Sequence, residues 1–220
     1  MELSGVGKRM QRGEKMKQLY GCAVIVSGPS GVGKSTLCGR VRQALPDLGF
    51  SISCTTRSPR GTEQHGVEYF FLSHDEFEQR IANNEFVEHA KVFTNYYGTL
   101  KSQILDPVRR GEDVFLDIDV QGAMQIREAC KHDAELAKVC EFIFIAPPSL
   151  AVLEQRLKGR ATDSAEQQAI RLGQAKHELS FANKYDYIVV NDDLDTAAQE
   201  MLDLMMAFKL STKRRIWEND

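Results

Sequence analysis

The sequence predicts an α/β protein built in three layers, with helices on both faces of a mostly parallel sheet. Two observations support this fold class. The octapeptide GPSGVGKS at Gly28–Ser35 fits the pattern GxxxxGK[ST] and lies between an apolar strand pattern and an amphipathic helix pattern. Short, continuously apolar segments of the kind that parallel sheets bury recur along the chain, at 22–26, 114–119, 142–145 and 188–190.

The octapeptide has the features of a phosphate-binding loop, which indicates a sheet of the P-loop NTPase type. Its glycines at 28, 31 and 33 allow backbone N–H groups to turn inward, and Lys34 can reach the terminal phosphates of a nucleotide. An ordinary glycine-rich turn is the alternative, but the strand before it and the helix after it argue against that. We expect a nucleoside triphosphate to bind at Gly28, Pro29, Ser30, Gly31, Val32, Gly33, Lys34, Ser35 and Thr36, with Mg²⁺ on the Ser35 hydroxyl.

Composition argues against several other classes of protein. The chain of 220 residues has a net charge of −3, so no overall basic field suggests nucleic acid as the main partner. No apolar run approaches the roughly 18 residues of a membrane helix, and we expect no membrane partner. The five cysteines form no CxxC pair, which predicts reduced, packed cysteines in a cytoplasmic protein.

Residues 1–19 form a leader with five basic side chains, interrupted by Glu2 and Glu14. We expect a solvated, mobile and flexible segment, because these two acids interrupt the basic run. A targeting or nucleic-acid-binding arm is the alternative for this leader.

Residues 54–99 have the pattern of a small, mostly β insertion. A short strand pattern at 50–53 precedes it, and strand patterns within it occur at 66–72 and 86–93. Ser73 and Glu76 form a capping box, which predicts a short helix with Phe77 and Ile81 on its apolar face. The preceding loop carries Arg57 and Arg60 around a proline that excludes a helix there; spacing alone favours ordinary solvated arginines.

The segment after the insertion delivers two carboxylates to the sheet. Residues 100–110 have a helical pattern that we expect Pro107 to kink or to end early. The strand at 114–119 ends in Asp117 and Asp119, which we expect on one strand face at the carboxyl end of the sheet, where ligands bind, unless a loop begins between them. Beside a phosphate loop these carboxylates are candidate magnesium ligands, and strand-end turn residues are the alternative.

Residues 147–175 predict a mobile helical flap, because two helical patterns flank a polar stretch. The leucines of the first helix, at 150, 153 and 157, are expected to face inward. Arg156 and Arg160 share another face of that helix, and the second helix carries Arg171; arginines on an exposed helix are ordinarily only solvated. A strand at 188–190 and an amphipathic helix at 194–208 complete the chain.

Taken together, these stretches resemble the guanylate kinases, which phosphorylate GMP to GDP with ATP. The similarity covers about Ala23 to Phe208 and rests on GPSGVGKST, SCTTRSPRGTEQHGVEY, EFVEHAKVFTNYYGT, LDIDVQGA, FIFIAPPS and VVNDDLD. Cys54 and Pro107 depart from the family pattern without touching a proposed catalytic contact. The resemblance implies one domain at 20–212, with a core at 20–53, 100–146 and 186–212, a GMP-binding region at 54–99 and a lid at 147–175.

The resemblance also implies a role for each site residue. The guanine would be read by Ser53, Glu88 and Thr99, and the GMP phosphate held by Arg57, Arg60, Tyr69 and Tyr97. The acidic pair near guanine and magnesium would be Asp117 and Asp119, and Asn191 would lie near the adenine of ATP. The catalytic cations would be Lys34, Arg57, Arg156, Arg160 and Arg171. Mg²⁺, which accompanies ATP, would bind Ser35 and Asp117, directly or through water.

Direct transfer to a nucleoside monophosphate fits these residues, because the acceptor brings its own anionic nucleophile and needs no general base. Three alternatives remain: a catalytically inactive binding module of the same fold, a monophosphate kinase for another base, and a P-loop ATPase acting on nucleic acid. An intact phosphate loop and intact lid arginines argue against the first, Glu88 against the second, and the net charge weakly against the third. GMP and dGMP are both expected acceptors, and the sequence does not decide between a monomer and a homo-oligomer.

Overall fold

A parallel sheet lies at the centre of the fold. The computed structural model describes residues 14–18, 20–158 and 165–219. In this part of the chain the main sheet has five strands in the order β10-β9-β2-β8-β3, all paired in parallel. The strands are β2 (Ala23–Ser27), β3 (Gly49–Phe50), β8 (Val114–Asp117), β9 (Cys140–Ala146) and β10 (Tyr187–Val190). The predicted parallel sheet is therefore confirmed.

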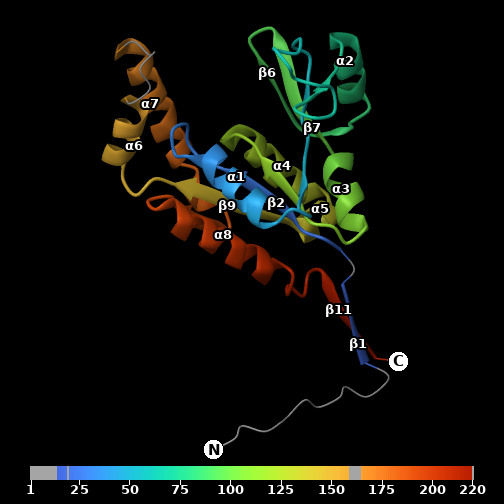
Figure 1. Ribbon diagram of the computed structural model, residues 1–220. Coiled ribbons are helices and arrows are strands. Elements are labelled where there is room, and N and C mark those ends of the chain that lie inside the picture. Colours follow the sequence, from blue (N-terminus) through green and yellow to red (C-terminus); the bar gives the residue numbers. More distant parts are fainter. Residues whose placement is uncertain (1–13, 19, 159–164, 220) are drawn as a thin grey trace, which may run out of the picture.

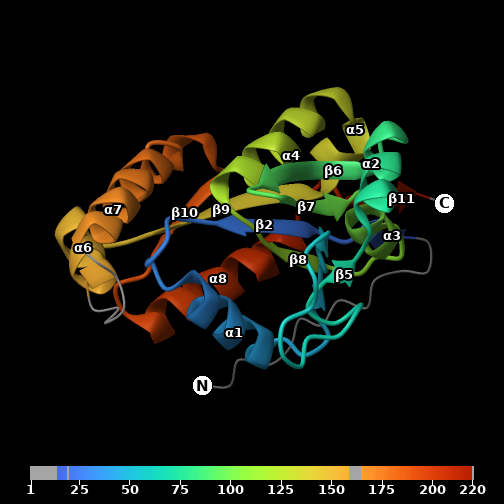
Figure 2. The same cartoon turned by 90° about the horizontal axis from the view of Figure 1, so that it is seen from above.

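Helices cover both faces of this sheet, as Figure 2 shows. One face carries α1 (Lys34–Ala44) and α8 (Leu194–Phe208); the other carries α3 (Ser102–Arg109), α4 (Val120–His132) and α5 (Ala134–Val139). Successive side chains of β2 point to opposite faces of the sheet. Val24 and Val26 pack in the core under α1 and α8, and Ala23 and Ile25 pack in the core under α3, α4 and α5. The three layers are as predicted, and α5 is an addition to the predicted elements.

A second, smaller sheet forms the insertion. Its order is β5-β4-β7-β6, from β4 (Cys54–Thr55), β5 (Phe70–Phe71), β6 (Phe86–Val92) and β7 (Asn95–Leu100). Helix α2 (His74–Ala82) packs on it through Phe77, which stacks on Phe86 with ring centroids 4.2 Å apart. The capping box is confirmed, because Ser73 accepts from the Glu76 N–H and Glu76 accepts from the Ser73 N–H.

Three predicted elements differ from the structure at their ends. The strand expected at 66–72 shrinks to β5, because Gly66 at φ +82° belongs to a turn before it. The strand expected at 50–53 ends at Phe50. Helix α3 contains Pro107 and ends two residues later, where the Arg110 and Glu112 N–H groups both donate to the Pro107 carbonyl.

The predicted flap contains α6 (Leu150–Lys158) and α7 (Ala165–Leu179), followed by the short helix η1 (Ala182–Lys184). Helices α6 and α7 have a core of their own, in which Leu153, Leu157 and Ala175 are buried. Leu150 was expected to face inward, but it is 48% exposed, because it begins the helix outside this core. In Figure 1 the α6–α7 pair and the small sheet rise above opposite sides of the main sheet.

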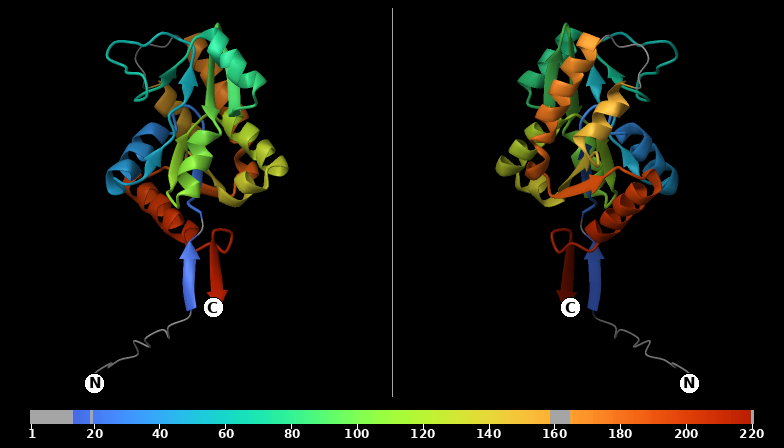
Figure 3. Two further views of the ribbon diagram at one scale, coloured as in Figure 1. Left: turned by 90° about the vertical axis from the view of Figure 1, so that its right-hand side faces the viewer. Right: turned by 90° about the vertical axis from the view of Figure 1, so that its left-hand side faces the viewer.

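The two ends of the described chain pair with each other. Strand β1 (Glu14–Gln18) is antiparallel to β11 (Arg215–Asn219), and Figure 3 shows this pair projecting from the body. The expectation of a flexible leader is therefore wrong for residues 14–18, whose partner strand is too distant in sequence for a local pattern to reveal; residues 1–13 lie outside the described part. Regular structure also continues beyond the predicted domain end at residue 212.

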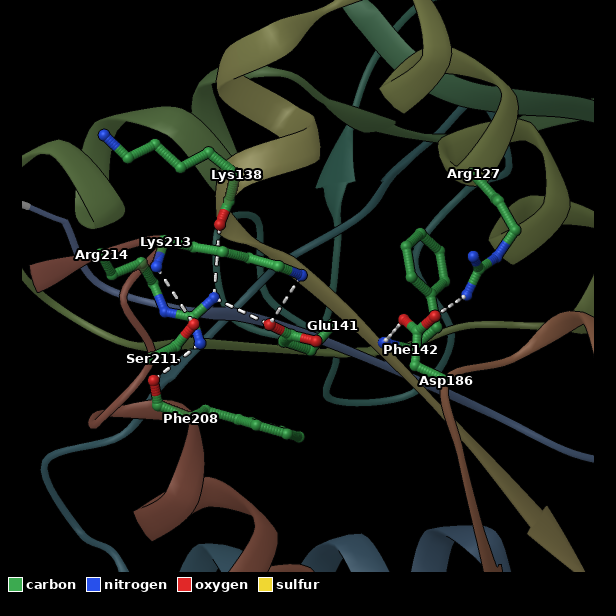
Figure 4. Close-up of polar contacts among 9 residues, drawn as sticks. All are labelled: Arg127, Lys138, Glu141, Phe142, Asp186, Phe208, Ser211, Lys213 and Arg214. Atoms are coloured by element: carbon green, nitrogen blue, oxygen red, sulfur yellow. Dashed lines mark hydrogen bonds and ion pairs between the residues drawn. The ribbon is translucent and has the colours of Figure 1, made fainter.

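Arg214 fixes the start of β11 to the body of the protein (Figure 4). Its side chain is buried and donates from Nη1 to Glu141 Oε1 over 2.9 Å and from Nη2 to the Phe208 carbonyl over 2.7 Å. Nη1 also donates to the Lys138 carbonyl over 3.3 Å. A buried ion pair thus joins the chain after α8 to the beginning of β9.

All five cysteines are free thiols, and four of them are buried. Among the described residues, none of the helices combines the length and the apolar character needed to cross a membrane.

Candidate active site

The phosphate loop follows β2 and leads into α1. Gly31 and Gly33 have φ values of +85° and +90°, a backbone region that L residues rarely adopt. A Cβ on Gly33 would lie 2.5 Å from Asn191 Nδ2, and one on Gly28 would lie 2.4 Å from the Ile145 carbonyl oxygen. Gly33 is therefore required both by its conformation and by close approach, whereas Gly28 is required by close approach alone.

Two residues assigned to the nucleotide sites support the loop itself. The Val32 carbonyl accepts from Asn191 Nδ2 over 2.8 Å and from Arg156 Nη1 over 3.3 Å. Arg156 Nη1 also donates to the Asn191 carbonyl over 2.9 Å. Arg156 and Asn191 thus lie against the phosphate loop, and Arg156 connects helix α6 to it; sequence spacing gave no signal for these contacts.

Lys34, at the start of α1, forms an ion pair with Asp117, at the end of β8. The pairing follows from the sheet, because β2 and β8 are neighbours and Val26 is in register with Asp117. Burial lowers the pKa of Lys34. Asp119 does not share the strand face of Asp117, contrary to prediction: it caps the amino end of α4 and accepts from the Gly122 N–H over 2.7 Å.

A cavity of about 290 Å³ lies where the small sheet meets the end of β8. This volume is near the lower end of the roughly 300–1,000 Å³ of small-molecule pockets. Six of its lining residues were assigned to the acceptor site, namely Ser53, Tyr69, Glu88, Tyr97, Asp117 and Asp119. Asp117 is therefore common to this cavity and to the ion pair with Lys34.

Glu88 is the buried carboxylate of the cavity, with 9% of the residue exposed. Thr99 Oγ1 donates to Glu88 Oε1 over 2.6 Å, and the Ser53 hydroxyl lies 3.4 Å from Thr99 Oγ1. Burial raises the pKa of Glu88; the Thr99 hydrogen bond opposes that rise and Asp119 adds to it. The three residues assigned to the guanine thus form one group, in which Thr99 fixes one oxygen of the carboxylate.

Arg57 lies beside the cavity with its guanidinium carbon 5.0 Å from the centre of the Tyr69 ring. The Tyr69 and Tyr97 rings meet edge to face at 6.2 Å. Glu63, which sequence reasoning did not single out, binds Arg57 through both carboxylate oxygens and accepts from the Arg60 N–H. The Arg60 residue is exposed. The signal for Glu63 was local: an acid three residues after Arg60 in a turn that contains Gly61.

A model of one protein family, described as Guanylate kinase, matches residues 20–208. The chain belongs to the guanylate kinase family. The guanylate kinase of Escherichia coli strain K12 is 46% identical over 202 residues, which cover 91% of this chain and 94% of that protein. That of Carboxydothermus hydrogenoformans is 43% identical over 194 residues, covering 88% and 92%. The resemblance inferred from the motifs is therefore confirmed.

A solved structure agrees with this assignment. The crystal structure of guanylate kinase from Anaplasma phagocytophilum matches with a TM-score of 0.68 at 30% sequence identity, covering 92% of this chain and 93% of that one. The guanylate kinase fold therefore extends over nearly all of the chain, including the small sheet and the α6–α7 pair that rise above the main sheet in Figure 1.

Helix α7 of this guanylate kinase fold brings another carboxylate to the phosphate loop. Glu178 Oε2 accepts from the Ser30 N–H over 3.2 Å, and burial raises the pKa of Glu178. No local pattern marks this residue, since its partner is 148 positions away. Arg171 lies on α7 and is partly buried, whereas Arg160 lies outside the described residues.

The residues near Lys34 have the donor chemistry that a magnesium ion requires. Ser35 is exposed in the first turn of α1, and Asp117 offers a partly exposed carboxylate on the neighbouring strand. Hydroxyl and carboxylate oxygens suit Mg²⁺, which in kinases takes one or two protein ligands together with phosphate oxygens and water. Within the described ranges, no three or more His, Cys, Asp or Glu side chains are grouped to hold a metal ion by themselves.

Proposed function

We propose that this chain transfers the terminal phosphoryl group of ATP to GMP, giving ADP and GDP. The observation that carries the proposal is the position of Asp117, which pairs with Lys34 of the phosphate loop and also lines the cavity around Glu88. The end of a triphosphate on the loop would then lie next to the phosphate of a monophosphate in the cavity. Direct in-line transfer needs this adjacency of donor and acceptor.

The roles of the cations follow from the charge that builds up on the transferring group. Lys34 would contact the terminal phosphates of ATP, and Arg57 and Arg60 the phosphate of GMP, with hydroxyls from Tyr69 and Tyr97. The acceptor oxygen is already anionic, so no residue has to remove a proton from it. The residues have only to align the two substrates and to neutralise the negative charge of their phosphates. When bound with ATP, Mg²⁺ would supply further charge neutralisation, held by Ser35 and Asp117.

The lid at 147–175 would close over the donor and exclude water from the transfer. Its separate core of Leu153, Leu157 and Ala175 supports this role, because such a part can move as a unit. Arg156 already lies at the loop, and Arg171, with Arg160, would add positive charge at the phosphates on closure.

The base specificity would come from Glu88. Guanine presents a ring N–H and an exocyclic amine side by side, and one carboxylate can accept from both. Thr99 already orients that carboxylate, and the Ser53 hydroxyl is close enough to serve the carbonyl of guanine. Adenine would instead turn a ring nitrogen lone pair toward a buried charge, so AMP should be rejected by a factor on the order of ten thousand. The same contacts accommodate dGMP, since none of them involves the ribose.

The test is a coupled assay with ATP and a panel of GMP, dGMP, IMP, AMP, CMP and dTMP. We expect GMP and dGMP to be used best and IMP, which lacks the exocyclic amine, to fall between GMP and AMP. Glu88→Gln should lower kcat/KM for GMP by about a hundredfold, while the Kd for ATP stays near that of the parent. Glu85→Gln, on a half-buried carboxylate that pairs with Arg80, is the matched control and should change neither.

A parent enzyme that prefers AMP, CMP or dTMP would overturn the specificity, and so would a Glu88→Gln variant with unchanged kcat/KM for GMP.

We place this activity in the cytoplasm, since free thiols such as the five in this chain persist where the environment is reducing. The proposal involves neither nucleic acid nor membrane as a partner.

A further inference from the structure

Glu63 binds the guanidinium of Arg57 with both of its oxygens. Arg57 Nη1 donates to Glu63 Oε2 over 2.6 Å, and Nη2 donates to Oε1 over 2.7 Å. Two parallel charge-assisted bonds fix the plane of a guanidinium as well as its position. The pair is largely shielded from water, with 10% of the Arg57 side chain and 23% of the Glu63 side chain exposed.

The same carboxylate also organises the turn that carries the second arginine. Glu63 Oε2 accepts from the Arg60 N–H over 2.8 Å, and the Glu63 N–H donates to the Arg60 carbonyl over 3.0 Å. Glu63 therefore connects Arg57 and Arg60 through one side chain. Its hydrogen bonds with Arg57 lower the pKa of Glu63 to about 2, so the carboxylate stays charged at neutral pH.

Arg57 keeps donors for a ligand while it is held in this way. Nη1 donates its second hydrogen to the Ser58 carbonyl over 3.0 Å. Among the described contacts of Arg57, none uses Nε or the second hydrogen of Nη2, and these two form the other bidentate edge of a guanidinium. The ring of Tyr69, which lines the cavity, lies under the same guanidinium.

We propose that Glu63 is a positioning residue for the acceptor phosphate: it holds one bidentate edge of Arg57 so that the adjacent edge, formed by Nε and Nη2, can bind that phosphate. The proposal rests on the proposed function, in which Arg57 contacts GMP. It also separates two roles within one cluster. Arg57 touches the substrate, whereas Glu63 acts only through Arg57 and the Arg60 turn.

The experiment compares Glu63→Gln with the parent in steady-state kinetics and in calorimetric binding of GMP, guanosine and ATP. Glutamine keeps the shape of the side chain but loses its charge and one of the two acceptors. We expect KM and Kd for GMP to rise about tenfold, with kcat changed less than about threefold. Guanosine, which has no phosphate, and ATP should bind as they do to the parent.

Glu68→Gln is the matched control, because Glu68 is an exposed acid of the same loop that binds only the Gln64 N–H among its described contacts. A general loosening of the loop would weaken guanosine and GMP alike, so equal losses for both would overturn the proposal. Tighter GMP binding by Glu63→Gln would also overturn it, since Glu63 would then compete with the phosphate.

Arg57→Ala separates this proposal from the proposed function. If Arg57→Ala leaves the KM for GMP unchanged, the role of Arg57 as a phosphate ligand is wrong. If Arg57→Ala raises that KM but Glu63→Gln does not, the role of Glu63 is wrong and the proposed function stands. In the Arg57→Ala background Glu63→Gln should weaken GMP binding less than it does in the parent, because only its contact with the Arg60 turn is left to lose.

Discussion

Replacing Arg214 with methionine should destabilise the protein far more than an ordinary surface substitution. Removing one partner of a buried ion pair typically costs about 3–5 kcal/mol, because the other charge is left buried. Here Glu141 would lose its 2.9 Å bond, and the Phe208 carbonyl would lose the donor at 2.7 Å. Lys213 Nζ stays 3.4 Å from the same Glu141 oxygen and is half-exposed, so it offsets part of the loss.

We therefore expect a loss of about 3 kcal/mol, a large fraction of the roughly 5–15 kcal/mol that stabilises a typical domain. Urea unfolding followed by circular dichroism measures it as a lower midpoint at an unchanged slope. Arg215→Met, at the next position, is the control and should stay within about 0.5 kcal/mol of the parent.

A cost for Arg214→Met below about 1 kcal/mol would refute this reasoning. A Glu141→Gln, Arg214→Met double variant should recover part of the stability, because it removes the unpaired charge. A double variant no more stable than Arg214→Met would show that the loss has another origin.

Two further predictions concern the loop and the thiols. Lys34→Ala should lower kcat by a factor of about 100 or more without unfolding the protein, because the ammonium neutralises transferring charge; near-parental turnover in a folded variant would contradict the role assigned to the loop. Iodoacetamide at pH 8 should alkylate Cys130 first, since hydrogen bonding with Cys140 lowers the pKa of Cys130, whereas burial raises that of Cys22 to about 12 and those of Cys38 and Cys54 to about 11. Peptide mass spectrometry measures the order, and equal labelling of Cys38 would contradict it.

Elements with a local signal could be predicted from the sequence. The phosphate loop, the capping box at Ser73 and the apolar strands depend on residues a few positions apart, and each lies where its pattern indicates. For the acceptor site, spacing alone did not distinguish Arg57 from a solvated arginine. The assignment of Arg57 came from the family resemblance, and the structure adds its contact with Tyr69.

Contacts between distant segments could not be predicted, because one sequence does not state which remote residues meet. The pairing of β1 with β11, the bond from Ser30 to Glu178 and the ion pair of Arg214 with Glu141 are all of this kind. Asp119 is a different case. The alternation of side chains along a strand predicts that it shares a face with Asp117. The strand ends at Asp117, however, and Asp119 is the N-cap residue of α4.

The position of β2 in the sheet affects the order in which the chain can fold during its synthesis. This strand is fully buried, and its two neighbours, β8 and β9, begin only at Val114 and Cys140. Until the ribosome has added Cys140 and the residues after it, one edge of an apolar strand near the amino terminus has no partner. The small sheet, by contrast, has all of its strands between Cys54 and Leu100 and is available for pairing earlier. The loop at 28–35 is therefore synthesised well before the segments that surround it, because its contacts come from Arg156, Glu178 and Asn191.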